Sequence, residues 1–183
     1  MPEMQTTGRR DRLAMWGFVA AAVLLGGWVW HRATGQAGGI APGGERKAMP
    51  AMTLAQLGGG EWRLADHRGQ VVLMNYWATW CGPCREEMPG LARLWRELGP
   101  KGLAVVGVSI DQGSRDKVQA FVNAMKVPYP VALADPLSQM EWGMAGVPTT
   151  ILLDRHGRVA KSYVGAVRES DFRKDVEELL AER

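Results

Sequence analysis

Cys81 and Cys84 are the only cysteines among 183 residues, and they lie three positions apart. Two thiols cannot build a disulfide scaffold, nor can they supply the four thiolates of a structural zinc site. What remains is a single CxxC motif. Its chemistry depends on the elements that position it and on the redox compartment in which it lies.

The motif stands between a predicted strand and a predicted helix. The apolar run Gln70–Trp77 predicts a buried strand, and Arg85–Leu98 carries apolar side chains at helical spacing. A thiol at a helix N-terminus faces unpaired backbone N–H groups and the positive end of the helix dipole. Such settings lower a thiol pKa from about 8.5 to about 3.5–7.5.

This placement predicts different tasks for the two thiols. We expect Cys81 to be the exposed, attacking thiolate, and Cys84, one turn inward, to resolve a mixed disulfide formed on Cys81. Gly82 and Pro83 form the turn between them, and proline suits a helix start because it has no N–H to leave unpaired.

Two other uses of the cysteine pair are less favoured. A purely structural disulfide that closes so short a loop gains little entropy. A metal site needs further ligands, and His31, His67 and His156 show no suitable spacing. We therefore expect neither a metal nor a cofactor.

The N-terminal segment predicts export. Leu13–Trp30 is 18 residues long without a charge, and at about 1.5 Å per residue it spans about 27 Å as a helix. Arginines precede it, which favours a cytoplasmic N-terminus. We expect residues 1–12 to be cytoplasmic and 13–30 to form a transmembrane anchor or uncleaved signal. A cleaved signal peptide, a twin-arginine signal and a buried core helix are the alternatives.

Residues 31–50 are rich in glycine and predict a flexible linker, so the folded domain is expected over 51–183. Alternating apolar strands and amphipathic helices, followed by a hairpin and a last helix, predict an α/β fold with a central mixed sheet flanked by helices. The further elements expected are strands at Leu103–Ile110, Val131–Ala134, Thr149–Leu153 and Val159–Val164, and helices at Ser114–Met125, Ser138–Trp142 and Glu169–Leu180.

The motif Trp80-Cys81-Gly82-Pro83-Cys84 after a buried strand resembles the thioredoxin superfamily. The longer string VVLMNYWATWCGPCREEMP, with an anchor before it, resembles the TlpA/ResA-type membrane-anchored branch. The resemblance covers about Met52 to the C-terminus. It implies a thioredoxin-like fold with a strand-helix insert between Leu103 and Ala134, and a redox-active Cys81–Cys84 disulfide.

Further positions carry the resemblance. Val147 and Pro148 match the cis-proline loop, which implies that Pro148 lies beside the cysteines and that the loop backbone binds substrate. Pro89 matches a proline that kinks the active-site helix. An ordinary trans turn and a simple helix bend are the alternatives for these two prolines. Trp80 is expected to shield the site and contact substrate, whereas Trp77 is expected in the core.

One departure from thioredoxin concerns the proton acceptor. Asn75 stands six residues before Cys81, where cytoplasmic thioredoxins carry a buried aspartate, and an amide cannot take up a proton. The TlpA/ResA branch has an acidic residue three positions after the second cysteine, and Glu87 matches it. A buried carboxylate there can have a raised pKa and act as a proton shuttle. The alternative is a solvated surface glutamate, like Glu86.

The sequence thus predicts a thioredoxin-type protein-disulfide oxidoreductase, anchored to the membrane with its domain in the periplasm or outside the cell membrane. The resemblance implies a reductase of disulfides in exported proteins, with apocytochrome c as a candidate substrate and a DsbD- or CcdA-like membrane protein as reductant. A disulfide-donating oxidase and a copper- or haem-handling CxxC module are the rivals. A net charge of +3, mostly from residues 1–32, gives no support for nucleic-acid binding.

Overall fold

The computed structural model describes residues 39–134 and 146–182. These residues form a compact unit that begins at Gly39. Its strands are β1 (Thr53–Gln56), β2 (Glu61–Arg63), β3 (Val71–Trp77), β4 (Leu103–Ser109), β5 (Val131–Leu133), β6 (Thr149–Leu153) and β7 (Val159–Val164). Its α-helices are α2 (Gly82–Leu98), α3 (Arg115–Met125) and α5 (Glu169–Ala181), and 3-10 turns occur at Gly43–Glu45, Leu64–His67 and Gly99–Lys101.

The seven strands form one mixed sheet in the order β2-β1-β5-β4-β3-β6-β7. The central strand β3 pairs in parallel with β4 and antiparallel with β6, and every residue of β3 and β4 is buried. A strand with both faces covered is nearly continuously apolar, and Asn75 is the polar exception in β3. The predicted mixed α/β thioredoxin-like architecture is confirmed.

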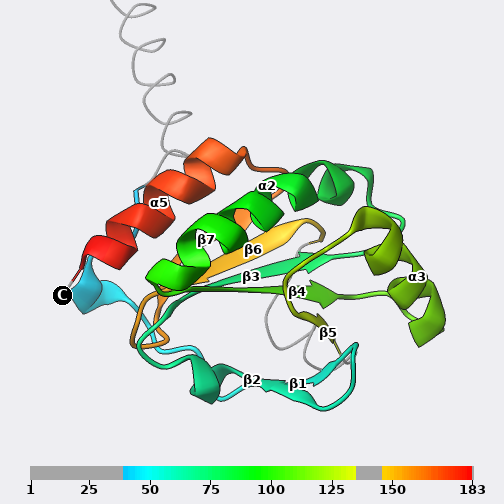
Figure 1. The fold of residues 1–183 in the computed structure, drawn as a ribbon. Coiled ribbons are helices and arrows are strands. Elements are labelled where there is room, and N and C mark those ends of the chain that lie inside the picture. Colours follow the sequence, from blue (N-terminus) through cyan, green and yellow to red (C-terminus); the bar gives the residue numbers. More distant parts are fainter. Residues whose placement is uncertain (1–38, 135–145, 183) are drawn as a thin grey trace, which may run out of the picture. The chain divides into compact units, whose positions relative to one another are not determined.

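Alternate residues of β3 point to opposite faces of the sheet, as strand geometry requires. Leu73 packs with apolar side chains of α2 and α5, and Trp77 packs with those of α2 and α3. Met74, between them, belongs to a core on the other face, which includes Met52 from the segment before β1. Figure 1 shows α2 and α5 side by side over the sheet. The C-terminal end of β3 leads directly into the cysteine motif at the start of α2.

The β1–β2 hairpin is an element that the sequence did not predict. Its two strands span four and three residues and pair in antiparallel register, Leu54 opposite Trp62. So short a run shows little periodicity in a single sequence. The strand β1 also extends the sheet beyond β5, with Ala55 opposite Leu133.

The structured domain begins earlier than the predicted boundary at residue 51. In the stretch expected to belong to a flexible linker, the Ala41 N–H donates to the Ala160 carbonyl, and Met49 is buried in the core. Arg46 is also buried, and its guanidinium donates to Asp154 at 3.2 Å and to Glu182 at 2.6 Å. Glycine content alone suggested a linker, but these contacts fix residues 41–49 on the domain.

Replacing Arg46 with alanine tests this assignment. The change leaves the buried Asp154 carboxylate with Arg158 as its remaining ion-pair partner. We expect the free energy of unfolding to fall by about 2–3 kcal/mol in chemical denaturation, since the loss of one partner from a buried ion pair is costly. Arg63→Ala, which removes an exposed ion pair with Glu61, is the matched control and should leave the midpoint unchanged. Equal midpoints for both variants would show residues 41–49 to be a linker after all.

The predicted anchor at 13–30 and the predicted helix Ser138–Trp142 lie outside the described residues. Within the part that is described, no helix is long and apolar enough to cross a membrane.

Candidate active site

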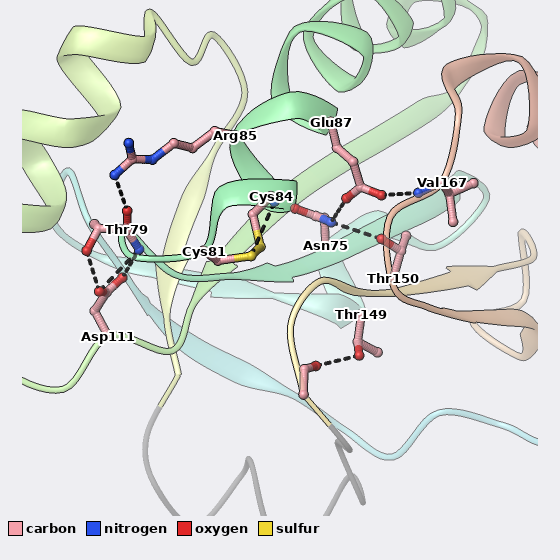
Figure 2. The surroundings of a disulfide bond; sticks show 11 residues. Asn75, Thr79, Cys81, Cys84, Arg85, Glu87, Asp111, Thr149, Thr150 and Val167 are labelled. Carbon is pink, nitrogen blue, oxygen red and sulfur yellow. Dashed lines mark hydrogen bonds between the residues drawn. A yellow bond between two sulfur atoms is a disulfide. The ribbon is translucent and has the colours of Figure 1, made fainter.

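Cys81 and Cys84 form a disulfide at the start of α2, with their Cα atoms 5.3 Å apart. Cys81 is the N-cap residue of the helix, and its Sγ accepts a hydrogen bond from the Cys84 backbone N–H at 3.2 Å (Figure 2). Pro83 lies in the first turn of the helix, as predicted. The Cys81 sulfur therefore sits at the position where backbone N–H groups and the helix dipole favour negative charge.

The two cysteines differ less in exposure than the sequence suggested. Cys81 is 5% exposed and Cys84 is fully buried, so the attacking sulfur is covered rather than open in this disulfide-bonded state. Both pack in an apolar cluster that includes Trp77 and Met88. Trp80, by contrast, is 68% exposed beside the motif. An exposed indole next to a covered disulfide provides an apolar contact surface.

The loop that precedes β6 packs against the apolar cluster around the cysteine pair. The Val147–Pro148 peptide bond is cis, and Val147 packs against the apolar cluster that contains Cys81 and Cys84. The Thr149 hydroxyl donates to the Gly146 carbonyl at 2.7 Å and closes the loop (Figure 2). The predicted cis-proline loop is thus present. Pro89, the other predicted proline, lies inside α2.

Glu87 is buried, 6% exposed, and is not a surface glutamate like its exposed neighbour Glu86. One carboxylate oxygen accepts a hydrogen bond from the Val167 backbone N–H, and the other accepts from the Asn75 amide at 3.4 Å. Burial raises the pKa of Glu87 to about 7, although both hydrogen bonds lower it. The carboxyl group therefore changes its protonation state near neutral pH, one helical turn after Cys84.

Asn75, on strand β3 of the sheet, donates its amide hydrogen bond to Glu87 on α2. Its Nδ2 also donates to the Thr150 hydroxyl at 2.9 Å, so the amide links α2 to β3 and β6 (Figure 2). The sequence showed only that Asn75 cannot accept a proton. In the structure, its amide instead orients the carboxylate that can.

Asp111, in the loop after β4, is a site residue that the sequence did not reveal. Its carboxylate accepts hydrogen bonds from the backbone N–H of Thr79 at 2.9 Å and from the Thr79 hydroxyl at 2.6 Å. On the other side, Arg85 donates to the Thr79 carbonyl at 2.6 Å. Asp111 lies 30 residues after Cys81, so no local motif connects the two.

No group of three histidine, cysteine or acidic side chains able to hold a metal ion occurs in residues 39–134 and 146–182. His67 instead stacks on Trp62, with ring centroids 4.9 Å apart, and its Nδ1 lies 2.7 Å from the Gln70 side-chain oxygen.

Comparison with known proteins shows the family to which this chain belongs. The AhpC/TSA family model matches residues 46–178. The thiol:disulfide interchange protein HelX of Rhodobacter capsulatus is 37% identical over 139 residues, which cover 74% of this chain and 76% of HelX. The thiol-disulfide oxidoreductase ResA of Geobacillus thermodenitrificans is 31% identical over 132 residues, 71% of this chain and 75% of ResA.

Solved structures show the same likeness. A secreted thiol-disulfide isomerase from Corynebacterium glutamicum superimposes with a TM-score of 0.70 at 31% sequence identity. The match covers 78% of this chain and 91% of the isomerase.

Proposed function

Because the chain belongs to the AhpC/TSA family and is a thiol–disulfide oxidoreductase of the ResA/HelX type, we propose that it reduces disulfides in exported proteins. The observation that carries this proposal is the Cys81–Cys84 disulfide at the N-terminus of α2, beside the Val147–Pro148 loop. The helix start stabilises a Cys81 thiolate, and the adjacent loop offers backbone groups to an extended substrate chain.

The proposed reaction has two exchange steps. The Cys81 thiolate attacks a substrate disulfide, so a bond forms between Cys81 Sγ and one substrate sulfur while the other leaves as a thiolate and takes up a proton. Cys84 then loses its proton and attacks Cys81 Sγ. The Cys81–Cys84 disulfide forms, and the second substrate thiol is released. Two electrons pass from the protein dithiol to the substrate.

Glu87 is the proposed acceptor of the Cys84 proton. It follows Cys84 at i,i+3 on α2, a spacing that places side chains on the same helix face. Its raised pKa of about 7 suits a base that works near neutral pH. Trp80, Val147 and Pro148 are the proposed substrate contacts. The exposed indole directly precedes Cys81 in the chain, and the loop with the cis Val147–Pro148 bond packs through Val147 against the cluster that contains the disulfide.

We also propose a direction of electron flow and a location for the domain. The Gly82-Pro83 dipeptide equals that of the reducing thioredoxins, which favours reduction. We propose that the domain is tethered outside the cytoplasmic membrane by residues 13–30. Its proposed substrates include apocytochrome c, whose haem-attachment CxxCH motif must be reduced, and its proposed electron source is a DsbD- or CcdA-like membrane protein.

Redox titration of the domain against glutathione or dithiothreitol tests the direction. We expect a reduction potential below about −220 mV, in the range of reducing CxxC proteins, because a reductase must give up its electrons readily. A potential near about −120 mV, the value typical of a strong oxidant, would overturn the reductase assignment in favour of a disulfide-donating oxidase.

A metal- or haem-handling module is the remaining rival. Copper titration of the reduced domain, compared with a variant in which His67 and His156 are replaced, separates it from an oxidoreductase. Tight binding that depends on these histidines, without disulfide exchange, would support the rival.

A further inference from the structure

The turn before Cys81 is held between two opposite charges. On one side, the Asp111 carboxylate accepts from the Thr79 N–H and hydroxyl, and it also accepts from the Ser109 hydroxyl at 2.8 Å. On the other side, the Arg85 guanidinium donates to the Thr79 carbonyl. Figure 2 shows both groups meeting at Thr79, two residues before Cys81.

Asp111 and Arg85, the two charged residues that hold Thr79, are themselves fixed by other contacts in the fold. Ser109, the last residue of β4, is buried, and its hydroxyl also accepts from the Asp111 N–H at 3.2 Å. The Arg85 guanidinium lies over the Phe121 ring of α3, 5.2 Å from its centroid. Phe121 in turn stacks on Trp77 at the end of β3, with ring centroids 5.2 Å apart. The two charges are therefore anchored on opposite sides of the turn.

The charges also act on the neighbouring sulfur in opposite directions. A carboxylate near Cys81 disfavours its thiolate, and a guanidinium favours it. The other acidic groups of the first turns of α2 are the exposed Glu86 and the buried Glu87, and the remaining cluster around the disulfide is apolar. Asp111 and Arg85 are thus the paired charges that contact the turn itself.

We propose that Asp111 and Arg85 are positioning residues that form a charge-balanced clamp on Thr79, and that their opposing fields set how readily Cys81 gives up its electrons. The proposal rests on the thiol–disulfide chemistry of Cys81 and Cys84, whichever direction that chemistry runs in the cell.

The test is the equilibrium constant for reduction of the full-length protein's disulfide by two glutathione molecules, which yields the protein dithiol and glutathione disulfide, at pH 7. Asp111→Asn leaves Arg85 unopposed, stabilises the thiolate and should favour the reduced form about threefold, a shift of about 14 mV toward a less negative potential. Arg85→Gln leaves Asp111 unopposed and should shift the constant about threefold the other way. The double variant should return close to the unmodified protein.

Three comparisons distinguish an effect of charge on the equilibrium constant from an effect of a loosened turn. Arg85→Lys keeps the charge and should leave the constant unchanged. Asp66→Asn and Arg96→Gln alter exposed charges away from the turn and serve as matched controls. Raising the ionic strength from 0.1 to 1 M shortens the screening length from about 10 to about 3 Å and should shrink both shifts.

Shifts of opposite sign that diminish in salt support the clamp. Shifts in the same direction, or none, would overturn it, because a merely structural role loosens the same turn in both variants. If the unmodified protein does not exchange with glutathione at all, the oxidoreductase function itself fails, which is a separate outcome.

Discussion

Replacing Cys84 with serine should convert the protein into a trap for its substrates. Cys81 can still attack a disulfide, but nothing resolves the mixed disulfide that forms, because a serine hydroxyl does not displace a sulfur. We expect turnover to fall below detection. Covalent adducts of about one substrate per protein should accumulate in cells and be identified by mass spectrometry after non-reducing separation.

The matched control is Cys81→Ser, which removes the attacking sulfur and leaves the buried Cys84. This variant should form few or no adducts, because Cys84 is fully buried beneath the motif. Adducts on Cys84 in equal yield would contradict the assigned roles of the two cysteines. If the Cys84→Ser protein captures exported proteins with paired cysteines, it also identifies the substrate class that the sequence leaves open.

Glu87→Gln should produce the second large effect. Glutamine keeps the size of the side chain and can still accept from the Val167 N–H, but it cannot take the Cys84 proton. In the unmodified protein, resolution of a preformed mixed disulfide should accelerate as pH rises through about 7, as Glu87 becomes ionised. In the variant, rapid-mixing measurements should show resolution at least about 100-fold slower above this pH, without that rise. An unchanged rate and pH profile would exclude Glu87 as the base.

The same variant also tests the raised pKa through stability. The pKa of Glu87 rises from its ordinary value of 4.5 to about 7 in the folded protein, so the folded state holds a proton that the unfolded state has lost between these values. This contribution to stability is fully present below about pH 4.5 and is lost as pH rises through about 7. Relative to Glu87→Gln, the oxidised unmodified protein should therefore become less stable across this range in urea denaturation. Parallel profiles would contradict the burial of the carboxyl group.

The core of the fold and the redox motif could be predicted because their signals are local. The buried run at β3, the amphipathic pattern of α2 and the CxxC between them all lie within 30 residues. The hairpin β1–β2 and the packing of residues 41–49 could not be predicted. Their strands are short, and the burial of Arg46 depends on Asp154 and Glu182, more than 100 residues away in the chain.

The active site, too, could be predicted only in part from the sequence. The placement of Glu87 followed from a family pattern, but its partners did not. Asn75 on β3 and Val167 in the loop before α5 reach it only through the tertiary fold, and the Thr150 hydroxyl on β6 accepts from Asn75 through sheet pairing. The Asp111 contact with Thr79 likewise depends on the parallel pairing of β3 and β4, which brings the ends of both strands together. The low exposure of Cys81 is set by tertiary packing, so the motif alone did not predict it.

The central claim is that the Cys81–Cys84 pair carries two electrons to a substrate disulfide, and one measurement tests it directly. The reduced domain is mixed with an equimolar oxidised CxxCH peptide, and both masses are followed over time. We predict that the domain loses about 2 Da, the mass of two hydrogens, as the peptide gains the same amount in a one-to-one ratio. A peptide that remains oxidised while the domain keeps both thiols would contradict the account.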